Sequence, residues 1–331
     1  MLVEIRRLWL EHDPQMAIAW QQLLEQTGLM QAESVDYTVG VVEDDQLLAT
    51  GSYQANILKC LAVAPTAQSE QWLMKMVSHL LSELHAQGIH HTFVYTKPVN
   101  ESVFRALGYQ PILATASVLF MEQGSPNFQD YQQFLHQRKV GKQGSAIVMN
   151  ANPFTKGHQY LVEQAAQVSQ QVYLFVLSED CSMFSTADRL AMVQLGVAAY
   201  DNVTVLPTND YAVSGATFPT YFLKAQAPLA LAKVQAKLDA TLFKEKIAPI
   251  LGITQRFVGE EPDSAVTAVY NQAMTEVFGD QLAVVILPRL TIGGEVISAS
   301  KVRQAIQAND WALVQTYVPK TSFDYLVKQI H

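Results

Sequence analysis

The first third of the chain alternates between hydrophobic spacing typical of helices and spacing typical of strands. Apolar residues recur every three or four positions over 1–30 and 68–86, which predicts two amphipathic helices. A third, shorter helix is predicted over 98–107. Short runs with alternating or continuous apolar residues predict strands at 37–42, 46–54, 57–64 and 92–96. We therefore expect a helix, three successive strands, a helix, a strand and a short helix.

The second half of the chain has a different pattern, in which apolar runs of strand length alternate with helical stretches. The predicted strands are 145–149, 172–177, 203–205, 255–259 and 283–287. The predicted helical regions are 157–169, 186–198, 217–249, 264–278 and 300–308. Strands separated by helices pair in the same direction, so we expect an α/β fold with a doubly wound, Rossmann-like parallel sheet. Such sheets bind ligands at the carboxyl ends of their strands.

A polar stretch separates the two patterns. Residues 122–144 begin with Ser125-Pro126, continue with a polar helical segment and end between two glycines. We predict a first domain over 1–122, a linker helix over 123–144 and a second domain over 145–331.

Composition narrows the classes of function. The chain has 331 residues, of which 49% are hydrophobic, and this length suggests two domains. A formal net charge of -8 argues against nonspecific binding to nucleic acid or to an anionic membrane, because both need a basic surface. No apolar run approaches the roughly 20 residues of a membrane span. Two cysteines far apart in sequence favour a reducing, cytoplasmic location and indicate no zinc site or disulfide framework.

The first candidate site follows the strand predicted over 145–149. The segment from Asn150 to His158 reads Asn-Ala-Asn-Pro-Phe-Thr-Lys-Gly-His and leads into an amphipathic helix. A strand, a tight turn and a helix place backbone N–H groups on a phosphate. Gly157 allows a ligand to approach the backbone closely, and His158 can hydrogen-bond a phosphoryl oxygen in a transition state. Taken singly, the same residues are also ordinary turn and helix-capping chemistry.

A second candidate phosphate site lies near the end of the chain. The segment Ile297-Ser-Ala-Ser-Lys-Val-Arg303 precedes a predicted helix, which Ser298 or Ser300 can cap. Ser300, Lys301 and Arg303 offer hydroxyl and cationic donors to phosphates. The alternative is a helix cap with two solvated cations.

A third segment, Arg256 to Asp263, ends a predicted strand in Gly259-Glu260-Glu261. Such a strand end suits recognition of adenine or ribose by backbone groups, and Glu260 or Glu261 could bind the ribose or Mg²⁺. The alternative is a strand-to-loop turn with exposed acidic residues.

The order of elements in the first domain resembles the acetyltransferase fold of the GNAT superfamily. Asn100, Phe104 and Leu107-Gly108-Tyr109 fall where that family has its "N…F…lGF" segment. The resemblance implies a GNAT-like α/β domain. Family members bind the CoA pyrophosphate with a glycine-rich turn, whereas residues 64–70 contain no glycine and end in Glu70. We therefore expect a docking or scaffold domain, with acetyl-CoA-dependent N-acetyltransferase activity as the alternative.

The two phosphate motifs resemble those of the nucleotidyltransferase superfamily. Residues 155–158 match its T/HxGH motif, with Thr155 in the place of the first histidine, and residues 297–303 match its ISSTxxR element, with Ala299 in the third position. The resemblance implies ATP binding. The residues that it implies for catalysis are His158, Thr155, Lys301 and Arg303. The residues that it implies for nucleotide binding are Asn150, Asn152, Phe154, Gly157, Gly259, Glu260, Ser298 and Ser300.

Further segments resemble the citrate lyase ligase family over essentially the whole chain. They are 175–180, 183–184, 187–189, 210–211, 216–224, 257–262, 270–271 and 297–300. Membership would imply that ATP and acetate, with Mg²⁺, form acetyl-AMP and pyrophosphate. The acetyl group would then pass to the prosthetic-group thiol of the citrate lyase acyl-carrier subunit.

The acetate pocket is the least determined part of this prediction. Its candidates by position at strand ends are Ser178, Asp180, Phe184, Arg189 and the 217–224 segment with Lys224. Two alternatives to the ligase stay open besides the acetyltransferase. They are an adenylyltransferase that acts on a small phosphorylated cofactor precursor, and a noncatalytic binding module.

Overall fold

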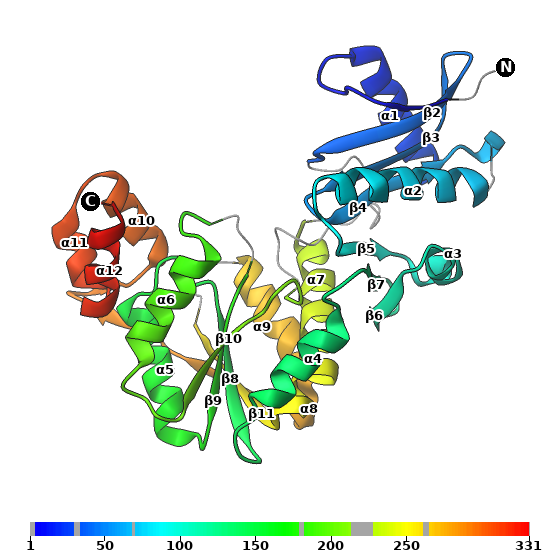
Figure 1. Ribbon diagram of the computed structural model, residues 1–331. Coiled ribbons are helices and arrows are strands. Elements are labelled where there is room, and N and C mark those ends of the chain that lie inside the picture. Colours follow the sequence, from blue (N-terminus) through cyan, green and yellow to red (C-terminus); the bar gives the residue numbers. More distant parts are fainter. Residues whose placement is uncertain are drawn as a thin grey trace. The chain divides into compact units, whose positions relative to one another are not determined.

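The computed structural model describes residues 4–29, 34–67, 70–178, 182–212, 228–260 and 265–330 (Figure 1). These residues form two compact units, which we describe separately. The first unit holds the described residues up to Asp130 together with 228–234. The second holds the described residues of 131–212 and those from Gln235 onward. The predicted domain boundaries at residues 122 and 144 stay a prediction.

The first unit is built on a mixed sheet in which seven described strands have the order β1-β2-β3-β4-β5-β7-β6. Its elements are β1 (Glu4–Arg7), α1 (Pro14–Gln26), β2 (Tyr37–Glu43), β3 (Gln46–Gln54), β4 (Ile57–Val63), α2 (Glu70–Ala86), β5 (Thr92–Thr96), α3 (Glu101–Ala106), β6 (Gln110–Ala114) and β7 (Leu119–Gln123). Neighbouring strands run antiparallel except β4 and β5, which are parallel. This arrangement is the GNAT-like order expected from the sequence.

The start of the chain corrects one expectation. Residues 1–30 were expected to be one helix, but Glu4–Arg7 pairs antiparallel with β2 as an edge strand. The helix begins only at Pro14, because the Asp13 side chain accepts a hydrogen bond from the Met16 backbone N–H and Pro14 needs no N–H partner in the first turn. Pairing with a distant strand thus overrides the local helical spacing.

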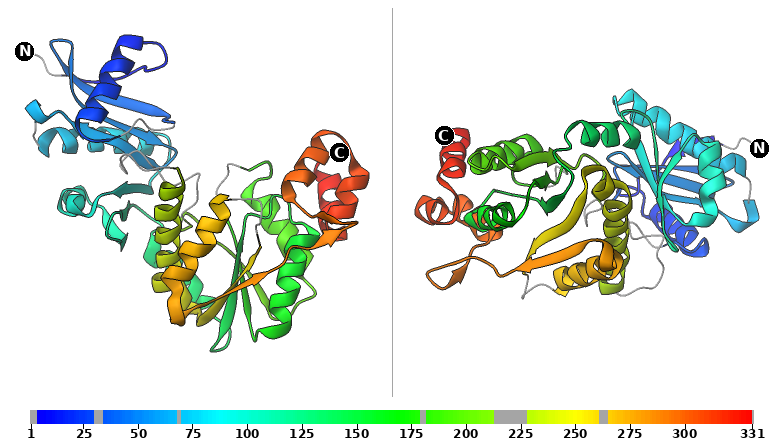
Figure 2. Two further views of the ribbon diagram at one scale, coloured as in Figure 1. Left: turned by 180° about the vertical axis from the view of Figure 1, so that it is seen from behind. Right: turned by 90° about the horizontal axis from the view of Figure 1, so that it is seen from below.

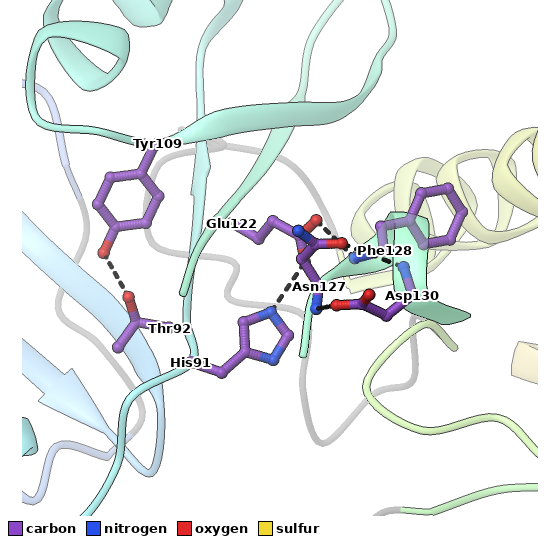
Figure 3. Close-up of polar contacts among 7 residues, drawn as sticks. All are labelled: His91, Thr92, Tyr109, Glu122, Asn127, Phe128 and Asp130. Carbon is purple, nitrogen blue, oxygen red and sulfur yellow. Dashed lines mark hydrogen bonds and ion pairs between the residues drawn. The ribbon is translucent and has the colours of Figure 1, made fainter. Parts of the chain in front are cut away.

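Buried polar side chains form hydrogen bonds between the later elements of the first unit (Figure 3). Tyr109 is fully buried, and its hydroxyl shares a 2.9 Å hydrogen bond with the Thr92 hydroxyl. At the end of β7, Glu122 accepts one hydrogen bond from the Phe128 backbone N–H at 2.8 Å and pairs with His91 Nε2 at 2.8 Å. Glu122 therefore fixes the first turn of α4 (Phe128–Gln137) to the strand that precedes it.

The second unit contains a sheet whose five described strands have the order β10-β9-β8-β11-β12 and are all parallel. The strands are β8 (Gly144–Met149), β9 (Val172–Val176), β10 (Val203–Pro207), β11 (Ile253–Gly259) and β12 (Ala283–Leu287). The helices are α5 (Lys156–Val168), α6 (Thr186–Val197), the part of α7 (Pro228–Leu242) from Gln235 onward, α8 (Ala248–Leu251), α9 (Ala265–Phe278), α10 (Ala299–Gln307), α11 (Trp311–Tyr317) and α12 (Lys320–Ile330). Chain order reverses between β8 and β11, which confirms the predicted doubly wound parallel sheet.

Helices cover both faces of this sheet (Figures 1 and 2). Ile147, Leu174 and Phe257 point to the face that packs against α5 and α6 in one apolar cluster. Successive side chains of a strand point to opposite faces, so Val148, Phe175 and Arg256 lie on the face covered by α7 to α9. A short hairpin of β13 (Thr291–Ile292) and β14 (Glu295–Val296) precedes α10. In the described part of the chain, no helix is long and apolar enough to span a membrane.

Candidate functional site

A pocket of about 580 Å³ opens at the carboxyl ends of β8 and β11, where the strand order reverses. All three segments singled out in the sequence contribute to its lining. The predicted site residues that line it are Asn150, Thr155, Gly157, His158, Gly259, Ser298 and Ser300. Asn152, Phe154, Glu260, Lys301 and Arg303 are not among the residues that line it. The fold thus brings together segments that lie more than a hundred residues apart.

Thr155 and His158 form a capping box at the start of α5. The His158 backbone N–H donates to the Thr155 hydroxyl at 3.3 Å, and the Thr155 backbone N–H donates to His158 Nδ1 at 3.0 Å. The Thr155 hydroxyl also lies 3.0 Å from Nδ1. A backbone N–H can only donate, so Nδ1 must accept. The neutral ring therefore carries its proton on Nε2, and Nε2–H is the donor that it can offer to the pocket.

The surroundings of His158 favour the neutral ring. Burial, with a smaller contribution from the positive charge of Arg289, lowers the pKa of His158 to about 4. The ring stacks on Phe154 with 5.8 Å between ring centroids and 17° between planes. Phe154 is itself fully buried in the core, against Gly196. At neutral pH, His158 is thus an oriented, uncharged hydrogen-bond donor, and Phe154 holds the orientation.

Gly157 belongs to the first phosphate motif and lies against Ile297 of the second. A methyl group in place of its hydrogen would lie 3.5 Å from Thr155 Oγ1 and 3.7 Å from Ile297 Cβ, which are ordinary contact distances. Its backbone is not in the left-handed region, so the chain itself does not demand glycine there. The absent side chain therefore leaves room on the pocket side without being needed for the fold.

Arg189 organises the loops beneath the pocket. Its side chain is fully buried and donates to the carbonyl oxygens of Asn150, Leu177 and Phe184, and to the side chains of Asn150 and Thr186. This arginine was a sequence candidate for attracting acetate. Burial and its many partners make it a positioning residue for the chain after β8 and β9.

Phe184 is likewise buried, and its backbone N–H donates to the Asn152 side chain at 3.3 Å. Ser178 donates its own backbone N–H to Thr208 at 3.0 Å. Asp180 and residues 217–224, the other acetate candidates, lie outside the described residues.

The start of α10 faces the same pocket. Ser298 occupies the capping position, and its side chain makes no capping hydrogen bond within the described structure. Arg303 joins the two phosphate motifs, because it donates to the Asn152 carbonyl at 2.7 Å and to the Ser300 hydroxyl at 2.9 Å. Lys301 is exposed and pairs with Glu295 at 2.8 Å. Arg303 and Lys301, equivalent as donors in the sequence, thus have different surroundings.

The end of β11 forms another wall. An added methyl group at Gly259 would meet no described atom within 4 Å, so the backbone there is open to the pocket. Glu260 is exposed, and its carbonyl accepts from Arg289 Nε at 2.9 Å. Glu261 lies outside the described residues. Among the residues that are described, no group of three or more His, Cys, Asp or Glu could hold a metal ion.

Four residues that line the pocket were assigned no functional role from the sequence: Arg256, Tyr270, Asn271 and Arg289. Arg256 offered a signal, since it is a charged residue inside an otherwise buried parallel strand. Tyr270 and Asn271 are one of the segments that carry the family resemblance, but their helical spacing does not distinguish a pocket-facing position from a core position. Arg289 lies in a loop after β12, and its sequence neighbours give no motif.

Comparison with known proteins adds independent information. The model of the family described as "Citrate lyase ligase C-terminal domain" matches residues 144–326. The [citrate [pro-3S]-lyase] ligase of Haemophilus influenzae is 36% identical over 93% of this chain and 94% of its own length. The ligase of the same name from Klebsiella pneumoniae is 35% identical over 99% of this chain and 97% of its own.

Solved structures are more distant in sequence. A putative GNAT-family acetyltransferase from Desulfovibrio desulfuricans is 16% identical and covers 37% of this chain and 99% of its own, with a TM-score of 0.32. TmcAL from Thermotoga maritima, bound with alpha-thio ATP, is 15% identical and covers 57% of this chain and 56% of its own, with a TM-score of 0.36.

Proposed function

This chain belongs to the citrate lyase ligase family, and from that membership we propose that it uses ATP to activate acetate and acetylates a thiol of citrate lyase. The curated relatives are ligases of citrate lyase by name and match nearly the full chain. A thiol acceptor must stay reduced, so we place the reaction in the cytoplasm. The acceptor that we propose is the prosthetic-group thiol of the acyl-carrier subunit.

The proposed reaction has two steps. An acetate oxygen attacks the α-phosphorus of ATP, the bond to the bridging oxygen breaks, and pyrophosphate leaves with its electron pair. The thiolate of the acceptor then attacks the acetyl carbon and AMP departs, which yields the thioester. A free carboxylate is a poor acyl donor, and the adenylate supplies the good leaving group that thioester formation needs. Neither step requires a nucleophile from this chain, so its residues act by positioning and charge stabilisation.

His158 is the central donor in this proposal. Its Nε2–H would hydrogen-bond the α- or β-phosphate as negative charge develops there. A neutral ring gives up no proton in that role, which suits a step in which only a P–O bond is exchanged. The N-termini of α5 and α10 add the partial positive charge of their helix dipoles, and Gly157 lets the phosphates approach.

Arg303, Ser298 and Ser300 would hold the distal phosphates. Arg303 already reaches both motifs through Asn152 and Ser300, so it keeps them in register as well as adding charge. Lys301 would have to release Glu295 to reach the same phosphates. Gly259 and Glu260 would lie near the adenosine. Mg²⁺ takes few protein ligands when it accompanies a triphosphate, so a dedicated carboxylate cage is not required for it.

The single observation that carries the proposal is the shared pocket. Thr155, Gly157 and His158 from one motif line it together with Ser298 and Ser300 from the other, at the switch point of the sheet. A triphosphate must meet both motifs at once, and this pocket of about 580 Å³ is large enough for a nucleotide-sized ligand.

Exchange of labelled pyrophosphate into ATP tests the proposal. We expect exchange that depends on acetate and needs no protein acceptor. Exchange that instead required pantetheine phosphate or nicotinamide mononucleotide would favour an adenylyltransferase of cofactor synthesis. Acetyl transfer from acetyl-CoA without ATP would favour the hypothesis of an acetyl-CoA-dependent acetyltransferase. Transfer of labelled acetate to the acyl-carrier subunit then tests the second step separately.

A further inference from the structure

A buried arginine lies on the opposite side of the sheet from the two phosphate motifs. Arg256 is only 4% exposed and lines the pocket together with Tyr270 and Asn271 of α9. Its neighbour Phe257 packs into the core beneath α5, so the Arg256 side chain points to the face covered by α7 and α9. We call Arg256, Asp239 and Tyr270 the Arg256 cluster.

The cluster leaves part of the guanidinium without a partner. Arg256 Nη1 lies 3.9 Å from Asp239 Oδ2, which is too long for a hydrogen bond. The Tyr270 hydroxyl donates to that same Oδ2, and burial followed by the charge of Asp239 raises the pKa of Tyr270, so the hydroxyl keeps its proton. Arg256 Nε is buried and has no hydrogen-bond partner in the described structure. The Phe243 ring, 4.8 Å from the guanidinium carbon, covers another side.

A buried guanidinium donor without a partner is costly unless a ligand completes it. The ligand that best fits a guanidinium is a carboxylate, because its two oxygens match the planar array of N–H groups. We propose that the Arg256 cluster binds the carboxylate of the acyl donor. This inference rests on the proposed function and assigns the substrate subsite within it.

The position of the cluster fits the chemistry of the first step. The attacking oxygen and the departing pyrophosphate must lie on opposite sides of the α-phosphorus. The pocket reaches from Ser298 and Ser300 at the start of α10, across the sheet edge, to Tyr270 and Asn271 on α9. Distal phosphates at α10 and a carboxylate at Arg256 would therefore approach the α-phosphorus from opposite ends.

Other arginines near the pocket suit this role less well. Arg189 is saturated by the loops that it supports. Arg303 bridges the phosphate motifs. Arg289 donates to the Glu260 carbonyl, and its charge acts on His158, which places it on the phosphate side.

Acetate dependence of ATP–pyrophosphate exchange tests the assignment in the full chain. Removing Arg256 alone would take its positive charge away from the buried Asp239 carboxylate, so the variant of choice is the double substitution Arg256→Gln with Asp239→Asn. We expect the KM for acetate to rise about 10- to 100-fold, because a charge-assisted pair is lost. The dissociation constant for ATP, measured by calorimetry, should change by less than about twofold, which also reports that the variant is folded.

Two further variants keep the test decisive. Tyr270→Phe retains the ring and removes one hydroxyl, and it should raise the KM for acetate about threefold by loosening Asp239. Arg289→Gln removes a cation from the same pocket and should weaken ATP binding while leaving the KM for acetate within about twofold.

The outcomes separate this inference from the proposed function. An unchanged KM for acetate in the double variant overturns the assignment, as does an equal loss of ATP and acetate binding. If the double variant does not fold, an unchanged KM for acetate in Tyr270→Phe overturns it instead. Wild-type protein without acetate-dependent exchange would reject the proposed function itself.

Discussion

The segment between β8 and α5 in the second unit and the segment between β4 and α2 in the first both lead from a strand to a helix. The two segments differ in the backbone N–H groups and the free space that they offer to a ligand. Before α5, Thr155 and His158 close a capping box, and Gly157 leaves space beside the pocket. After β4, Pro65 has no N–H and begins a short 3₁₀ turn over Pro65–Ala67.

A strand-to-helix connection by itself thus supplies only a location for an anion. The residues in the turn decide whether N–H groups and space are available there. A GNAT-like strand order in the first unit is therefore compatible with a chain whose proposed chemistry lies in the other unit.

Replacing His158 should have the largest effect. His158→Ala removes the Nε2–H donor, and we expect kcat/KM for ATP–pyrophosphate exchange to fall about 10²- to 10³-fold, or about 2.7–4 kcal/mol, as for one lost oxyanion donor. The matched control is His136→Ala, an exposed histidine on α4. Full activity in His158→Ala would remove the β8–α5 turn from the mechanism.

Acid should destabilise the protein through His158. Its pKa in the folded state is about 4, below the ordinary value of 6.5. The unfolded chain therefore binds a proton below pH 6.5 that the folded protein does not yet bind. This contribution to the free energy of unfolding is fully present above pH 6.5 and is lost as pH falls toward 4.

Denaturant unfolding at a series of pH values measures the effect. Between pH 6.5 and 4, we expect the free energy of unfolding of the wild type to fall because of His158 by at most about 3 kcal/mol. His158→Gln should not show this part of the fall. Other groups titrate in both proteins, so the difference between the two curves isolates His158. Parallel curves would mean that His158 is not held neutral by the fold.

Substitutions of Arg303 and Lys301 should have very different effects on exchange activity, although the two residues lie only two positions apart. Arg303→Ala breaks hydrogen bonds to Asn152 and Ser300, and we expect exchange activity to fall about 10- to 100-fold. Lys301→Ala removes only an exposed pair with Glu295, and we expect less than about a threefold change. Similar losses in steady-state exchange assays of both variants would show that Lys301 leaves Glu295 to reach the phosphates.

Gly157→Ala should act on nucleotide binding without affecting the fold. The added methyl group meets its neighbours at ordinary contact distances, so thermal unfolding should stay close to the wild type. The methyl group would occupy space that a phosphate needs, and we expect the KM for ATP to rise about tenfold. A loss of stability as large as the loss of affinity would contradict this view of the turn.

Changing the other turn should have the smallest effect. Pro65→Gly restores an N–H and backbone freedom after β4, but Pro65 does not line the pocket. We expect acetate-dependent exchange to change less than about twofold. A loss of tenfold or more would show that the first unit takes part in adenylate formation.

Much of the site could be predicted from the sequence because its chemistry is local. The run from Asn150 to His158 contains a cap, a glycine and a histidine within one turn, so its capping box and the open space at Gly157 depend on short-range spacing. The same holds for Ser298 and Ser300 at the start of α10. Residues of both motifs line one pocket at the carboxyl ends of the strands, where the alternation of strands and helices predicted a ligand site.

Other site features depend on contacts that spacing does not record. Phe154 was predicted to bind nucleotide as part of a motif, yet its side chain is buried in the core and stacks on the His158 ring. Arg189 reads as a free cation, yet its donors serve the loops around it. The residue types alone could not show that Arg303 and Lys301 have different surroundings. Arg303 donates to Asn152, whereas Lys301 pairs with Glu295.

The doubly wound sheet and the two candidate phosphate motifs could be predicted from the sequence, because hydrophobic periodicity and capping chemistry act over a few residues. Three features came only from the folded chain: Glu4–Arg7 is an edge strand, His158 presents Nε2, and Arg256 lies opposite the candidate phosphate motifs. Each of these depends on pairing or packing between segments, or on the direction of a side chain within the fold. Burial and partner choice are set by that folded environment, so the pattern along the chain does not contain them.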